Sequence, residues 1–190
     1  MFKTIFSKLF GTAPNASAAI STPKTAELNT KAPPDITEYY RAEIANSTFI
    51  KESGREAVLR DFLHEVKLKD GEPLSLEEKR SLGINPRLKI TRELYKVLTP
   101  EGVEFGPKKV LESLYLTATI HHSHRAALAR MRIAGIAQYS LMSCGDGQDC
   151  DWCVSMEGKL IPIEVDFVRL SKENCTCYRC GCVLRAKIDF

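Results

Sequence analysis

The spacing of hydrophobic and polar positions along the chain changes near residue 135. Before that point apolar side chains recur about every three to four residues, which is the spacing of a helix with one buried face. The clearest such stripe consists of Ala57, Val58, Leu59, Phe62, Leu63 and Val66. After that point short apolar runs are separated by turn residues, which is typical of strands. The pattern predicts an α+β fold, helical over its N-terminal two-thirds and β-rich at its C-terminal end.

Capping signals mark where the helices of the first part begin. Asp35, Ser53 and Ser75 are each followed three residues later by a glutamate, which is the capping-box pattern. Residues 99–102 have the composition of a turn, and Ser123 is expected to start a new helix after a break. Further helices are expected over residues 87–98, 107–120 and 124–134.

The C-terminal part contains three runs with the composition of short strands. They cover residues 136–142, 159–165 and 183–188. Pro162 lies within the second run, and because proline has no amide hydrogen it confines that strand to the edge of a sheet. We therefore expect a small β element built around the turns that hold the cysteines.

The first 34 residues differ in composition from the remainder. Residues 1–10 form a short basic amphipathic segment, and residues 11–34 have the composition of a flexible linker. The apolar face of the segment consists of Phe2, Ile5, Phe6, Leu9 and Phe10. It can dock on a partner protein or on a membrane surface, or it can pack on the body of the same chain. The expected organisation is residues 1–34 as peptide and linker, 35–135 as a helical region and 136–190 as a cysteine-rich β element.

Composition indicates a globular chain without a membrane span. Of its 190 residues, 44% are hydrophobic and 27% are charged. No apolar run reaches the roughly 18 residues that a transmembrane helix needs, and the N-terminus lacks the apolar core of a secretory signal. We expect a protein of the bacterial cytoplasm or of a virion, in which thiols stay reduced.

All seven cysteines lie between residues 144 and 182. Cys150 and Cys153 form a Cys-x-x-Cys turn, and Cys177 and Cys180 form a second one. Two such turns supply four thiolates for a tetrahedral zinc ion, and a site with four protein ligands has no open position for catalysis. The ligand set stays open at this stage, because Cys175, Cys182 or Cys144 can replace a member of the second turn. A redox dithiol formed by the first turn is the competing interpretation.

The order of motifs from about Thr117 to Leu184 resembles that of phage head-morphogenesis proteins of the Mu F type. The matching features are the helix and glycine at residues 130–135, Tyr139, Asp146, Cys150, Cys153, the Gly158-Lys159 turn, and Asn174, Cys175 and Cys177. Lys172 stands where that family has a histidine. The resemblance implies a non-enzymatic assembly protein of a capsid or portal, acting through its surfaces on other proteins.

Basic residues suggest a second type of function. The candidates for contacts with phosphate groups are Lys108, Lys109, His124, Arg125, Arg130 and Arg132. The net charge of +3 is accounted for by residues 1–34, so the remainder of the chain is formally neutral, unlike most dedicated nucleic-acid binders. The leading hypothesis is a zinc-stabilised protein-interaction module without catalysis. A nucleic-acid-binding zinc ribbon is the alternative, and a nuclease or dithiol oxidoreductase comes third.

Overall fold

The computed structural model describes residues 35–188, except 146, 148, 178 and 179. This part of the chain contains eight α-helices and one three-stranded antiparallel sheet. Six of the helices precede the first strand, and the other two lie between the strands in sequence. Most of the helical structure precedes the sheet, and the sheet lies beside the cysteines. The α+β fold predicted from the sequence is therefore confirmed.

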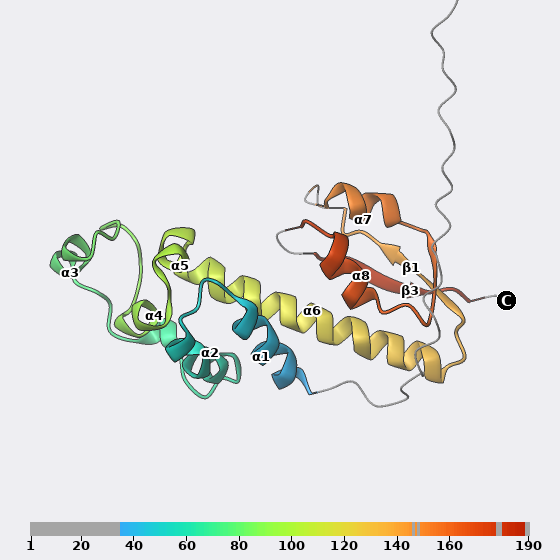
Figure 1. Cartoon of the computed structure of the whole chain (residues 1–190), viewed down its shortest axis with the longest axis horizontal. Helices are drawn as coiled ribbons and strands as arrows, with labels where there is room; N and C mark the ends of the chain where they lie inside the picture. Colours follow the sequence, from blue (N-terminus) through green and yellow to red (C-terminus); the bar gives the residue numbers. More distant parts are fainter. Residues whose placement is uncertain (1–34, 146, 148, 178–179, 189–190) are drawn as a thin grey trace, which may run out of the picture.

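The longest element, helix α6 (Pro107–Ile133), connects the two halves of the molecule. Its 27 residues span about 40 Å at the usual rise of an α-helix. Figure 1 shows α1 and α2 beside the first half of α6, and the sheet with α7 and α8 beside its second half. One helix thus contributes to two separate hydrophobic cores.

The first of these, which we call the helical core, is formed by buried residues between Tyr40 and Ala118. The elements of this half are α1 (Ile36–Asn46), η1 (Glu52–Gly54), α2 (Arg55–Phe62), η2 (Leu68–Asp70), α3 (Leu76–Ser81), α4 (Arg92–Val97), α5 (Pro100–Phe105) and the first half of α6. Of these, α3 contributes no buried side chain. Tyr40 packs against both Phe62 and Tyr115, with ring centroids 5.3 Å apart in each pair. Aromatic and aliphatic side chains therefore hold α1, α2 and α6 together.

The second, which we call the cysteine core, is formed by buried residues between Leu128 and Leu184. Its elements are β1 (Gln138–Met142), α7 (Asp151–Met156), β2 (Leu160–Pro162), α8 (Phe167–Asn174), β3 (Val183–Ala186) and the second half of α6. The strand order is β2-β1-β3. Tyr139 pairs with Ile161 and Leu141 with Leu184, and these four side chains are buried together. The predicted edge position of Pro162 is confirmed, because β2 lies at one side of the sheet.

Polar contacts join the two halves along α6. Glu43 of α1 accepts hydrogen bonds from the imidazole of His121 at 3.2 Å and from the ammonium group of Lys172 at 2.8 Å. Arg125 of α6 donates to Asp166, the residue that caps the start of α8, at 2.8 Å. These contacts place α8 against both α1 and α6.

Several predicted helix boundaries are wrong. The expected break near Ser123 is absent, since α6 continues through it. The expected turn at residues 99–102 is the start of α5, where Thr99 caps the amide of Gly102 and Pro100 occupies the first helical position. The helix expected from residue 87 begins only at Arg92.

Of the three predicted capping boxes, the one at Ser75 is confirmed. The Ser75 hydroxyl accepts from the Glu78 amide, and the Glu78 carboxylate accepts from the Ser75 amide. Asp35 precedes α1 without a side-chain cap, and Ser53 lies in a short 3-10 turn. The short helices α7 and α8 were not predicted.

None of the helices among the described residues is long and apolar enough to cross a membrane. The predicted docking segment, with Phe2, Ile5, Phe6, Leu9 and Phe10, lies outside the described residues.

Candidate metal centre

Two local structures bring cysteines to one point. Cys150 is the N-terminal capping position of α7 and Cys153 lies in its first turn, so their side chains are neighbours on the same side of the helix. Cys175 is the first residue after α8 and has an extended backbone, and Cys177 follows two residues later outside any helix or strand. Because Asp166 caps the start of α8 and its amphipathic face packs in the cysteine core, the end of α8 is fixed beside the start of α7.

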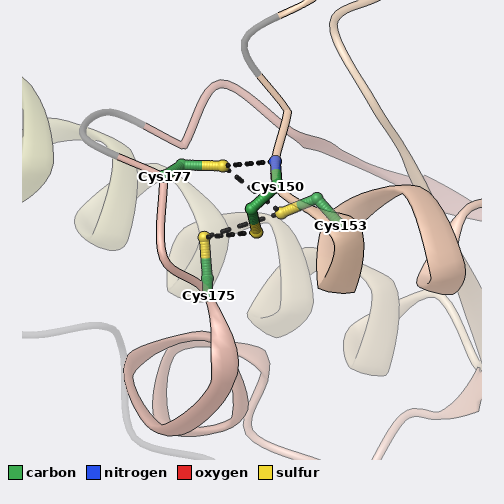
Figure 2. Close-up of side chains that lie close together, drawn as sticks. All are labelled: Cys150, Cys153, Cys175 and Cys177. Atoms are coloured by element: carbon green, nitrogen blue, oxygen red, sulfur yellow. Dashed lines mark hydrogen bonds between the residues drawn. The ribbon is translucent and has the colours of Figure 1, made fainter.

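The sulfur atoms of Cys150, Cys153, Cys175 and Cys177 all lie within 4.8 Å of one another. Figure 2 shows the four side chains turned toward a common centre. The sulfur of Cys175 is 3.8 Å from that of Cys150 and 3.5 Å from that of Cys153, and Cys153 and Cys177 are 3.8 Å apart. Four thiolates around a tetrahedral zinc ion, with bonds of about 2.3 Å, are about 3.8 Å apart. The cysteines are therefore grouped so that they can hold a single metal ion.

Backbone amides also favour thiolates at this point. The amide of Cys150 donates to the sulfur of Cys177 at 3.2 Å. Burial raises the pKa of the Cys150 thiol, but backbone hydrogen bonds at Cys153 and Thr176 outweigh burial and lower that pKa to about 5. Burial raises the pKa of Cys153, which is fully enclosed. Metal ligands must be deprotonated, and hydrogen bonds from backbone amides to the sulfurs favour that form.

The structure brings together three of the four cysteines expected to be ligands, namely Cys150, Cys153 and Cys177. The fourth member of this group is Cys175, which the sequence offered as an alternate. Cys180 instead groups with Cys153 and Cys182, and its sulfur is 3.8 Å from that of Cys153. All seven cysteines are among the described residues, and none of them forms a disulfide.

Apolar side chains enclose the cysteine cluster. The ring of Trp152 stacks on Phe167, with centroids 6.1 Å apart, and both pack in the cysteine core. The ring of His124 on α6 lies nearly perpendicular to that of Phe167, with centroids 5.1 Å apart. Its Nε2 lies 2.7 Å from the carbonyl oxygen of Cys182. Because a carbonyl oxygen only accepts hydrogen bonds, Nε2 carries the hydrogen, and burial lowers the pKa of this imidazole.

Most of the basic residues proposed for nucleic-acid contact make contacts within the chain. His124 is buried, as described above, and Arg125 is bound to Asp166. Arg132 donates to the carbonyl oxygen of Ile163 at 2.9 Å. Lys108 pairs with Glu112 at the opposite end of α6 from Arg130 and Arg132, about 33 Å away at the rise of a helix. The six residues therefore do not form one continuous basic surface.

The sequence identifies the first cysteine turn as part of the site, but it does not decide which two further cysteines complete it. The signal that identifies Cys175 is its position directly after an amphipathic helix that begins with Asp166 as a cap. Comparisons of the chain with protein-family models, with curated proteins and with solved structures found no match.

Proposed function

We propose that this protein is a zinc-stabilised interaction module without catalysis, of the kind used in phage head assembly. The observation that carries the zinc part is the convergence of the sulfurs of Cys150, Cys153, Cys175 and Cys177 within 4.8 Å. Four soft ligands in tetrahedral spacing favour zinc. A [4Fe–4S] cluster binds each of its four cysteines through a different iron and needs their sulfurs farther apart, so the spacing favours a single ion over such a cluster.

The position of the site supports a structural role. Its ligands come from the start of α7 and the end of α8, two segments that belong to a small core with short strands. Four protein ligands occupy every position of a tetrahedral ion, which leaves none for a water molecule or substrate. The ion acts as a cross-link that fixes α7, α8 and the sheet relative to one another.

The resemblance to phage head-morphogenesis proteins supports the assembly part. The cysteines that match that family's order, Cys150, Cys153, Cys175 and Cys177, are also the four whose sulfurs converge. Lys172, which stands where the family has a histidine, points its ammonium group to Glu43 and is outside the cysteine group. Four sulfurs complete the site without that histidine.

An exposed apolar face on the sheet is suited to protein contact. Met142, Leu160 and Val183 each expose close to half of their surface, and Met142 pairs with Val183 across β1 and β3. Interaction surfaces are commonly apolar at their centre with polar residues around them. We propose that this face meets a capsid or portal protein.

Metal content is the first test of this proposal. Full-length protein purified under reducing conditions should contain zinc by elemental analysis, and Cys150→Ser should contain less. Metal-free protein that keeps its fold would refute the zinc part.

Binding to phage structural proteins is the second test. The zinc-loaded chain is mixed with purified portal protein and, separately, with the capsid protein of the phage or prophage that encodes it. Binding should be measurable by calorimetry to one of the two, and Met142→Asp should weaken it at least about tenfold, since a charge must then be desolvated. Ile133→Asp, which places the same charge on an exposed apolar residue at the end of α6 and outside the sheet, is the matched control. Absence of binding to both proteins would refute the assembly part, and loss of binding on deleting residues 1–10 would identify that segment as the docking peptide.

A further inference from the structure

Three cysteines remain outside the four-sulfur site, and two of them form a second group with a member of the first. The sulfurs of Cys153, Cys180 and Cys182 lie within 4.8 Å of one another. Cys153 is therefore common to both groups. It is also fully buried, between the segment around Cys175 and the segment around Cys180.

The seventh cysteine, Cys144, lies beside this second group. A Cβ atom on Gly181, the residue between Cys180 and Cys182, would be only 2.7 Å from the Cys144 sulfur. The chain can pass so close to this sulfur because residue 181 has no side chain. Asp149 connects the same residues, since its Oδ1 is 3.7 Å from the sulfur of Cys144 and 3.9 Å from that of Cys182.

We propose that Cys144, Cys153, Cys180 and Cys182 hold a second zinc ion, and that the thiolate of Cys153 bridges the two ions. Two tetrahedral sites that share one ligand need seven sulfurs, which is the number of cysteines in the chain. A thiolate has several lone pairs, so one sulfur can bind two ions. This inference rests on the proposed zinc site at Cys150, Cys153, Cys175 and Cys177.

Ordinary packing accounts less well for these cysteines. A buried thiol such as Cys182 is common in protein cores, where it acts as a small apolar side chain. Packing does not explain why an exposed cysteine, Cys144, has its sulfur against the backbone between two other cysteines. Convergence of residues from the loop after β1, from α7 and from the segment before β3 is what a metal site requires.

The test is the number of zinc ions per chain, measured by native mass spectrometry and elemental analysis on the full-length protein. Wild-type protein should bind two ions. Cys182→Ser should bind one, and Cys150→Ser, which affects only the first site, should also bind one. Cys153→Ser should weaken both ions, because it removes the shared ligand. Ser143→Ala, beside Cys144 but outside both groups, should still bind two.

The results separate this inference from the zinc site on which it rests. One zinc in wild-type protein, lost in Cys150→Ser, would overturn the second ion and leave the first site standing. No zinc at all would overturn both. Two ions that both persist in Cys153→Ser would overturn the bridge.

A second variant avoids the risk that a buried substitution prevents folding. Cys144 is exposed, so Cys144→Ser should fold and should release one zinc to a chelator at least about tenfold more readily than wild type. If this variant behaves like wild type while Asp149→Asn loses one ion, the fourth ligand is the Asp149 carboxylate, and the role given to Cys144 is refuted.

Discussion

The helical core and the cysteine core achieve stability by different means. The helical core draws on four helices, α1, α2, α4 and α5, and on half of α6, whose leucine, isoleucine, valine and aromatic side chains fill it together with residues of the connecting segments. The cysteine core has a sheet with a strand of three residues, a helix of six and a helix of eight. A unit this small has a limited apolar core, and such units commonly use a metal as a cross-link. A metal bound by the clustered cysteines would compensate the cysteine core for its smaller apolar interior.

Removal of the proposed zinc ion is expected to have the largest effect on the difference between the two cores. Structural zinc contributes roughly 10–16 kcal/mol in small zinc domains, as much as the whole stability of many proteins. Trp152, the single tryptophan, lies in the cysteine core and reports on it selectively. Chelation should shift Trp152 fluorescence to longer wavelength while most of the helical circular dichroism remains, and added zinc should reverse the shift. An unchanged spectrum in protein shown to be metal-free would mean that the cysteine core does not depend on a metal for its structure.

Truncating a buried leucine in each core tests whether the cores unfold separately. Leu59 of the helical core and Leu128 of the cysteine core are 2% and 1% exposed. Leu59→Ala should lower the free energy of unfolding by about 2–5 kcal/mol through the cavity it creates, without changing metal content. Leu128→Ala should lower the midpoint followed by Trp152 fluorescence more than the midpoint followed by circular dichroism. Identical midpoints by both probes in both variants would mean that α6 couples the cores into one unit.

Glu43 connects the two cores, and its loss should have an intermediate effect. Its side chain is 16% exposed and accepts bonds from His121 and Lys172. Glu43→Gln should destabilise the protein by roughly 1–3 kcal/mol near pH 7, because hydrogen bonds to a charged group are replaced by weaker ones. Denaturant unfolding measures this change. Glu56→Gln is the control, since its ion pair with Arg41 is exposed and worth at most about 1 kcal/mol.

The effect of Glu43→Gln should depend on pH. Burial raises the pKa of Glu43, but the bonds from His121 and Lys172 outweigh burial and leave the pKa below its ordinary value of 4.5. A carboxyl whose pKa is lowered by folding stabilises the protein above its unfolded value and loses that contribution as pH falls through its folded value. The stability difference between wild type and Glu43→Gln should therefore be constant above about pH 5.5 and shrink below pH 4.5. A difference that grows on acidification would contradict this assignment.

The smallest expected effect lies at a helix start in the helical part. Ser75→Ala removes the capping bonds of α3 and should cost about 1 kcal/mol of unfolding free energy. Ser53 has the same capping-box pattern in the sequence but forms no side-chain cap. Ser53→Ala should therefore change the free energy of unfolding by less than about 0.5 kcal/mol. Equal losses in the two variants would show that the sequence pattern, rather than the observed bonds, determines stability.

The sequence predicts the fold class and the first cysteine pair because both depend on local pattern. Residues of a buried helix face and the two cysteines of a tight turn lie within one element, so spacing alone identifies them. The helix that starts at Thr99 and Pro100 could also have been predicted from the sequence, because threonine as a cap and proline at the first position favour a helix as much as a turn. The same holds for α8, whose cap Asp166 is present in the sequence.

Other features depend on contacts between distant residues. The continuous helix through Ser123 is fixed by His121 binding Glu43 and His124 packing on Phe167, neither of which is a local signal. The choice of Cys175 over Cys180 likewise depends on where α8 ends relative to α7. The cysteines at residues 175, 177, 180 and 182 allow several sets of metal ligands, and only the path of the folded chain decides which of them lie next to the first cysteine turn.

Helix α6 also affects how the protein emerges from the ribosome. Synthesis proceeds from the N-terminus, so every buried residue of the helical core, up to Ala118, is made before the cysteines. The apolar side chains of Leu128 and Met131 on the second half of α6 then stay uncovered until the later residues of the cysteine core have been made. In cells starved of zinc, we expect newly made chains to display this uncovered helix face and to be captured by chaperones or to aggregate. Supply of the metal would thus control the yield of the protein during translation.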